Sequence, residues 1–420
     1  MIPEKIEKPL FFHSFLIAAL LFAVLFYSGI VKMTDKHPYT ALISLSDTKK
    51  IEAVVCAAPA KSASGRFYLA ECALRSVFGE FNHHESRSSA SGRITVFVPA
   101  EIAESLFPGK LCKNPVYLDA GETVLFTGSA GEGGTFFADD VQCKGFFGAF
   151  GAVNAVRAAC RLQFRRLLYS WREAGGLLLA LITGCREYLE VRTGEAFRGA
   201  GVSHILAISG MHLVFISGNI ALVLYTLAGK RFKLLLLLAV QFLFVWFAGI
   251  SPSLFRALLC SMLSIMSAFC YKKIRHRLDF LALAFLVHAI IFPSHLFQIS
   301  FVFSYAACAG IFAFADLFEQ KMTAICPPAL SANIALSASA QTFTLPISAL
   351  VFRSLVPFAL FASVALSPLV SVFMIVGVIA IMLCLMLPML SPFFGVIIGA
   401  LYKTIFFTAT FFSGLPAIHF

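Results

Sequence analysis

VPFALFASVALSPLVSVFMIVGVIAIMLCLML, from Val356 to Leu387, is the stretch that decides the fold, because it contains no charged residue. A helix crosses the hydrocarbon core of a membrane with about 20 apolar residues. The composition agrees, since 59% of the 420 residues are hydrophobic and 13% are charged, whereas soluble domains carry about 25% charged residues. Together they predict a polytopic α-helical membrane protein.

Other apolar runs of spanning length lie on both sides of this stretch. The run from Leu10 to Val31 follows Lys5 and Lys8 and is too long for a cleaved signal peptide, so residues 1–36 are predicted to form an N-terminal anchor helix. If the long stretch breaks near Pro368, we expect about nine to eleven membrane helices, with residues 202–420 as a transmembrane bundle. The other predicted spans are Val202 to Ala228, Leu234 to Ile250, Leu254 to Tyr271, Phe280 to Phe292, Phe297 to Phe318, Leu330 to Val351 and Phe393 to Phe412.

Residues 37–150 differ from the rest, because they are polar and contain short alternating runs separated by turn signals such as Ser91-Gly92. Several short strands in about a hundred residues predict a small OB-like β-barrel domain. The segment from Asn82 to Ser91 is predicted to be a solvated loop. The predicted strands are Lys50 to Val55, Arg66 to Leu69, Gly92 to Val98 and Glu122 to Thr127.

A basic amphipathic helix is predicted between Asn154 and Arg172, within an interfacial region at residues 151–201. Arg157, Arg161 and Arg165 recur in it among apolar residues. One interpretation is a helix lying on lipid headgroups. The other is a positive collar that gathers polyanions at the mouth of a pore.

Basic residues also predict the orientation. The formal charge of +11 fits a membrane protein, because such proteins concentrate Lys and Arg in cytoplasmic loops. Basic loops at Lys230 to Lys233 and at Lys272 to Arg277 are two spans apart, so both are predicted to be cytoplasmic. The N-terminus is then cytoplasmic, and the strand-rich domain is extracytoplasmic, in a cell inner membrane.

The eleven cysteines show neither CxxC nor CxxH spacing, so we expect no metal site. The strand-rich domain would face an oxidising compartment, where cysteines form disulfides. Its four cysteines are therefore disulfide candidates with the pairing left open: Cys56, Cys72, Cys112 and Cys143.

Polar residues lie at predicted membrane depth, where they are costly unless they are paired or hydrated. We predict that they line a path through the bundle, and the alternative is a buried hydrogen-bond network that holds the helices together. The residues are His204, Ser209, Gly210, His212, Arg256, Gln298, Ser300 and Gln341.

Four motifs in this half of the chain resemble those of the ComEC competence family. Phe197-Arg-Gly-Ala-Gly-Val-Ser-His-Ile-Leu-Ala-Ile-Ser-Gly-Met-His212 is similar to the family's signature, and Ala248-Gly-Ile-Ser-Pro-Ser-Leu-Phe-Arg-Ala257 to its G-x-x-PS-x-x-RA element. Phe297 to Phe301 and Gln341 to Pro346 follow in family order. The chain departs from the family at Ser367-Pro368, where asparagine usually precedes the proline.

The resemblance implies a channel that imports single-stranded DNA during natural transformation. It also implies membrane lipid and other DNA-uptake proteins as partners. No H-x-H-x-D-H cluster and no P-loop occurs in the sequence, so we expect a separate nuclease and a cytoplasmic translocation motor. We expect no cofactor and no enzymatic activity, and the oligomeric state stays open.

An OB-type domain would bind a single strand through stacked rings and basic side chains. Phe67, Tyr68 and Phe97, with Arg66 and Arg93, are the candidates for this surface, although core packing is the favoured role for at least two of the rings.

Two other functions stay open. One is a transporter of another anionic solute. The other is an intramembrane serine hydrolase, because Ser209 and His212 lie one helical turn apart.

Overall fold

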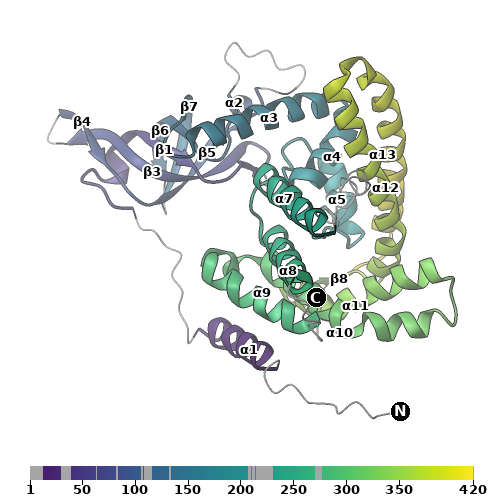
Figure 1. Cartoon of the computed structure of the whole chain (residues 1–420). Coiled ribbons are helices and arrows are strands. Elements are labelled where there is room, and N and C mark those ends of the chain that lie inside the picture. Colours follow the sequence, from purple (N-terminus) through teal and green to yellow (C-terminus); the bar gives the residue numbers. More distant parts are fainter. Residues whose placement is uncertain are drawn as a thin grey trace. The chain divides into compact units, whose positions relative to one another are not determined.

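A computed structural model describes residues 13–29, 39–62, 64–81, 84–105, 107, 116–131, 134–206, 210, 213, 230–269 and 277–419. The chain divides into two compact units (Figure 1). One comprises Met1–Asp35, Val191–Ile375 and Lys403–Phe420, and the other comprises Lys36–Glu190 and Val376–Tyr402. The predicted polar and interfacial regions thus fold largely as one unit, together with a hydrophobic segment from much later in the chain.

A seven-stranded sheet is the main element of the second unit. Five of its strands pair in a closed circuit in the order β1, β3, β5, β7, β6 and back to β1, and only the β5–β7 pair is parallel. Phe126, Phe136 and Val96 are fully buried in its core. The strands are β1 (Thr48–Val55), β2 (Ala60–Lys61), β3 (Phe67–Phe81), β4 (His84–Ser89), β5 (Arg93–Pro99), β6 (Glu122–Gly131) and β7 (Thr135–Phe146).

The predicted strands are confirmed as β1, β3, β5 and β6, but the predicted loop from Asn82 to Ser91 is wrong in part. His84–Ser89 forms β4, which pairs with β3 alone at the edge of the sheet. An edge strand does not have to bury alternate side chains, so its polar sequence lacks the hydrophobic period that identifies a strand.

Helices α3 (Gly151–Ser170) and α4 (Arg172–Thr183) follow β7 in the same unit. Arg172 takes a left-handed φ of 52°, which ends α3 and redirects the chain. Residues 174–183 of α4 are all buried. A Cβ on Gly175 would overlap the carbonyl of Leu168, and a Cβ on Gly176 would overlap the carbonyl of Tyr188, so glycine is required for this close packing.

The turn between α12 (Ala359–Met386) and α13 (Ser391–Ser413) lies beside this helix pair. The indole Nε1 of Trp171 donates to the carbonyl oxygen of Ser391 at 3.0 Å. If every predicted span crossed the membrane, this turn would be cytoplasmic, opposite the expected side of the strand-rich domain. Either the strand-rich domain is not on the predicted side of the membrane, or at least one predicted span does not cross it completely. The orientation therefore stays a prediction.

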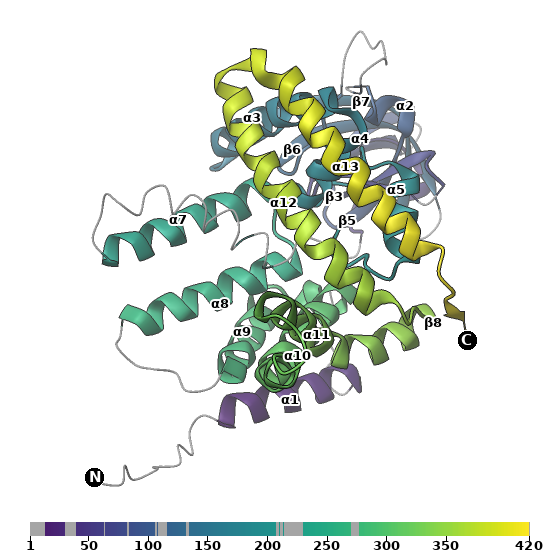
Figure 2. The same cartoon turned by 90° about the vertical axis from the view of Figure 1, so that its right-hand side faces the viewer.

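The first unit is helical, and α10 packs beside α11 in it (Figure 2). Four segments of the described chain are long and apolar enough to cross a membrane, namely Ile299–Met322, Leu330–Phe352, Ala359–Met386 and Pro388–Ser413. Besides parts of α12 and α13, the first unit contains α1 (His13–Tyr27), α5 (Val191–Gly199), α7 (Lys230–Ala248), α8 (Pro252–Phe269), α9 (Arg277–Ile291), η2 (Pro293–Phe297), α10 (Ile299–Met322), α11 (Pro328–Phe352), β8 (Ser354–Leu355) and β9 (Ile418–His419).

The predicted break near Pro368 is wrong, because α12 continues through this proline. A proline removes one backbone donor from a helix. Helices of membrane proteins tolerate this loss when neighbouring groups satisfy the freed carbonyl. The number of membrane helices stays a prediction, because most of Val202 to Ala228 lies outside the described residues.

Candidate functional site

Arg256 is the most unusual residue of the helical unit, because its side chain is buried and only 7% of the residue is exposed. Its guanidinium Nη1 donates to the carbonyl oxygen of Ser304 at 3.1 Å and also contacts the sulfur of Cys308. Its Nε has no hydrogen-bond partner within the described part of the chain. Among the described residues, the neighbours of this buried cation are thus a carbonyl and a thiol rather than a carboxylate.

Gly210 faces the same guanidinium. A Cβ added to Gly210 would lie 3.4 Å from Nη2 of Arg256 and 3.1 Å from the Cβ of Ala257. A larger residue would therefore crowd the cation. The structure thus brings together the glycine of one sequence motif and the arginine of another, which are 46 positions apart.

The other predicted path residues are placed differently. His204 is exposed, while Ser209 and His212 lie outside the described residues. Gln298 and Ser300 are exposed at the start of α10, and Gln341 is half-buried in α11. Their role in a path stays a prediction. Sequence reasoning missed Ser304 and Cys308, whose polar atoms are hidden in an apolar run.

An aromatic surface lies on the outer side of the strand-rich sheet, on β3, β5 and β7. The rings of Phe97 and Phe137 stack with centroids 4.8 Å apart and an interplanar angle of 23°. Phe67 meets both rings edge-on, at 6.1 and 6.0 Å. Tyr68, by contrast, is 2% exposed, so its predicted place on this surface is wrong, as the alternation of side chains along β3 requires.

Phe137 was not predicted, because the alternating pattern of β7 was not recognised in the sequence. Its parallel register with Phe97 brings it into the surface. Arg66 and Arg93 are exposed at the starts of β3 and β5. We call Phe67, Phe97 and Phe137 the aromatic platform.

The predicted arginine collar is not an exposed surface in this structure. Arg161 and Arg165 are 3% and 4% exposed, and Arg157 is half-buried. The three residues are four positions apart on α3 and face the interior of the unit. The exposed face of the helix carries Val153, Val156 and Arg166. The expectation that these arginines gather polyanions is therefore corrected for Arg161 and Arg165.

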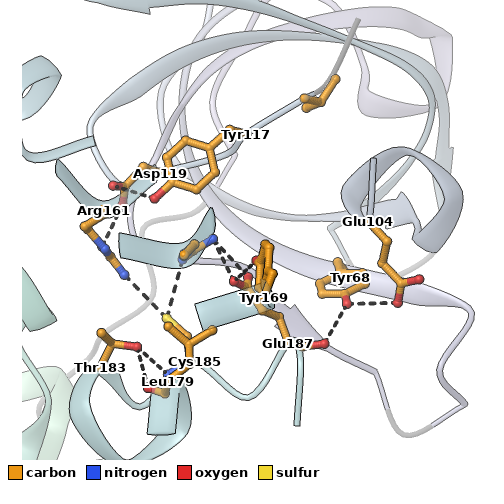
Figure 3. A network of polar contacts seen from close by, with 12 residues as sticks. Tyr68, Glu104, Tyr117, Asp119, Arg161, Tyr169, Leu179, Thr183, Cys185 and Glu187 are labelled. Atoms are coloured by element: carbon orange, nitrogen blue, oxygen red, sulfur yellow. Dashed lines mark hydrogen bonds and ion pairs between the residues drawn. The ribbon is translucent and has the colours of Figure 1, made fainter. Parts of the chain in front are cut away.

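Acidic partners from two other segments explain this reversal (Figure 3). Arg161 pairs with Asp119 at 2.7 Å, and Arg165 pairs with Glu187 at 2.9 Å. Arg157 donates to the carbonyl oxygen of Ala120. A buried guanidinium requires such a partner, because an unpaired buried charge is very costly. The sequence did not show which acidic residues these would be.

The same polar network continues to the sheet. Glu187 accepts a hydrogen bond from the hydroxyl of Tyr169 at 2.8 Å through its side chain and one from Tyr68 at 3.3 Å through its carbonyl. Tyr68 also donates to Glu104 at 3.0 Å. Burial, and then the charge of Glu104, raise the pKa of Tyr68. Burial is the largest single effect on Arg165 and lowers its pKa, but Glu187, Cys185 and the two neighbouring tyrosines together raise the pKa overall.

The cysteines of the strand-rich domain form no disulfide among the described residues. Cys56, Cys72 and Cys143 are free thiols, and Cys112 lies outside the described residues. Cys56 and Cys143 are exposed, and Cys72 is buried in β3. The predicted disulfides are therefore not formed by these three residues.

Comparison with known proteins gives a family for the membrane half. The family described as Competence protein matches residues 181–420. ComE operon protein 3 of Bacillus subtilis (strain 168) is 29% identical over 154 residues, which are 36% of this chain and 20% of that relative. The match thus spans about a fifth of the relative's length, and no solved structure matches the chain. Because the matching region covers more than half of the sequence, the chain belongs to the competence protein family.

Proposed function

We propose that the protein is an inner-membrane channel that imports single-stranded DNA during natural transformation. Family membership supports a role in competence and DNA uptake. The observation that carries the channel proposal is the buried Arg256 guanidinium facing Gly210. A charged residue in a membrane helix is retained at high cost and usually serves a transported ion or a charged substrate.

A path for DNA needs charges that contact phosphates without trapping them. Arg256 meets this requirement, because its Nη1 is partly satisfied by Ser304 and Cys308 while its Nη2 faces the glycine. Because Gly210 has no side chain, its backbone can lie close to the cation. A phosphate that passes there would offset the charge of the guanidinium without displacing a bound carboxylate.

The strand-rich sheet would receive the DNA first. We infer that its closed circuit of strands is the predicted OB-like barrel, since one parallel pair among antiparallel neighbours agrees with that type. The aromatic platform would stack bases, with Arg66 and Arg93 near phosphates. Other DNA-uptake proteins, a separate nuclease and a cytoplasmic translocation motor would complete the machinery.

The channel proposal predicts that import of single-stranded DNA depends on this chain. Cells that lack it should accumulate little nuclease-protected, labelled single-stranded DNA, and cells that regain it should recover this import. Uptake of labelled inorganic phosphate should not change. A change in phosphate uptake with unchanged DNA import would favour transport of another anion, and unchanged import of both would contradict both functions.

The platform predicts weaker binding of single strands when a ring is lost. Stacking on one aromatic ring contributes about 1–3 kcal/mol per base, so Phe97→Ala and Phe137→Ala should each weaken the binding of an oligothymidine by about 5- to 150-fold. Fluorescence anisotropy with the full chain in detergent measures this. Phe147→Ala is the matched control, because Phe147 is 56% exposed outside the platform. Equal affinities for all three variants would contradict the role of the platform.

A further inference from the structure

Three buried polar side chains of the helical unit form a continuous hydrogen-bonded chain. Nδ1 of His288 lies 3.1 Å from the hydroxyl of Tyr305, and Nε2 of His288 lies 2.9 Å from Nδ1 of His295. They belong to α9, η2 and α10, and their exposed fractions are 0% for His288 and 8% each for His295 and Tyr305. Both nitrogens of the central imidazole are therefore engaged.

Aromatic rings enclose these three hydrogen-bonded side chains. Phe255 and Phe301 each lie with their ring centroid 4.9 Å from that of His288, and Phe292 stacks on His295 at 4.9 Å. Phe285 meets Tyr305 edge-on at 5.3 Å. The hydrogen bonds thus lie in a largely apolar surrounding, where a proton that leaves one partner passes to the next rather than to bulk water.

Titratable and charged groups near these three side chains come from each neighbouring element. Helix α8 contributes Arg256 and Cys260, and α10 contributes Cys308 besides Tyr305. Helix α1 contributes Tyr27, which donates to the carbonyl oxygen of Leu296 at 3.0 Å. Asp279, the acidic residue of α9, is about two and a half turns from His288 along the helix.

This geometry permits two complete hydrogen-bond directions. In the first, Tyr305 donates to Nδ1 of His288, and Nε2–H of His288 donates to Nδ1 of His295. In the second, Nδ1–H of His295 donates to Nε2 of His288, and Nδ1–H of His288 donates to the Tyr305 oxygen. In both, every residue is neutral, because each imidazole carries one proton.

We propose that Tyr305, His288 and His295 form a proton relay within the membrane domain. A proton that arrives at the Tyr305 oxygen displaces the hydroxyl proton onto Nδ1 of His288. His288 releases its Nε2 proton to Nδ1 of His295, and His295 releases a proton from its own Nε2. One proton is taken up and one is released, so the first hydrogen-bond direction becomes the second and charge is conserved. The hydroxyl and the two imidazoles then turn back to the first direction before the next proton passes.

Arg256 offers a link between this relay and DNA, and this part of the inference rests on the proposed function. The residue before it, Phe255, packs on His288, and its guanidinium bonds the carbonyl of Ser304, next to Tyr305. Its positive charge repels the imidazolium that forms during transfer. A phosphate beside Arg256 would offset that charge, so a passing strand would speed proton transfer. Such a relay would couple the passage of DNA to a proton gradient.

The test measures proton flux by the full chain in phosphatidylcholine vesicles that enclose a pH-sensitive dye, with valinomycin and a potassium gradient. We expect the wild-type protein to pass protons at least about tenfold faster than protein-free vesicles, and added oligothymidine to increase the rate. His288→Gln and Tyr305→Phe should each lower the rate by at least about tenfold, the effect of a barrier about 1.4 kcal/mol higher.

Tyr27→Phe is the matched control. It removes a hydroxyl that bonds Leu296, beside His295, but that takes no part in the relay, so this variant should keep the wild-type rate. Wild-type flux equal to that of empty vesicles would overturn the relay whatever happens to DNA. If His288→Gln does not fold, unchanged flux in Tyr305→Phe would overturn it equally. Proton flux that oligothymidine does not alter, together with no DNA import, would leave the relay intact and refute the proposed function.

Discussion

Replacing Arg256 by alanine should lower the import of labelled single-stranded DNA by about 10- to 150-fold. A hydrogen bond from a charged group contributes about 1.5–3 kcal/mol. The loss of this free energy lowers a rate or an equilibrium constant by the stated factor. Arg256 is buried beside Gly210. A basic side chain on the exposed surface cannot reach this position to take over its role. The measurement is nuclease-protected label inside cells that carry equal amounts of each variant in the membrane.

Two further variants make this result specific. Arg256→Lys keeps the charge but loses the planar fork of donors, so import should be intermediate. Arg277→Ala is the matched control, because Arg277 is 64% exposed and its pair with Asp316 is 3.4 Å long. Equal losses in Arg256→Ala and Arg277→Ala would show a general effect of basic charge. Normal import in Arg256→Ala would refute the proposed path.

Replacing Asp119 by alanine should destabilise the unit that contains the sheet by about 3–5 kcal/mol, because it leaves a buried guanidinium without its partner. Asp119 is fully buried, and Arg161 is its ion-pair partner at 2.7 Å. The measurement is the resistance of the purified full chain to limited proteolysis and thermal unfolding. The double variant Asp119→Ala with Arg161→Met should recover much of the loss, since it removes both charges.

Asp316→Ala supplies the control for an exposed ion pair. The side chain of Asp316 is 75% exposed, and removal of such a pair changes stability by about 0–1 kcal/mol. If Asp119→Ala were as stable as Asp316→Ala, the buried network would not hold α3 to the sheet. If the double variant were as unstable as Asp119→Ala, the missing carboxylate would act through something other than the charge of Arg161.

The secondary structure followed the sequence wherever hydrophobic residues recur with a clear period. Long apolar runs predicted α10, α11, α12 and α13, and alternating residues predicted β1, β5 and β6. The polar edge strand β4 was missed because its buried position, Ser88, is a polar residue, so no hydrophobic period appears in the sequence. Pro368 misled the prediction of a break, because the effect of a proline depends on whether packing around the helix compensates for one lost donor.

The candidate site was predicted less completely, since its partners come from distant parts of the chain. The spacing of Arg157, Arg161 and Arg165 correctly placed them on one face of a helix. It did not show that this face points inward, because that depends on Asp119 and Glu187. In the same way, the apolar context of His288 and Tyr305 concealed their hydrogen bond, which forms only where α9 meets α10.

The uncharged stretch from Val356 to Leu387 and the motifs around Gly210 and Arg256 were sufficient to determine the class of protein and its family resemblance, because hydropathy and motif spacing are properties of neighbouring residues. Only the tertiary structure decided which polar groups meet. It turned the predicted arginine collar inward, placed Phe137 in the aromatic platform and set Gly210 against Arg256. The reason is physical, since a buried charge or polar group is stable only with a partner, and chain folding brings that partner from far away in the sequence.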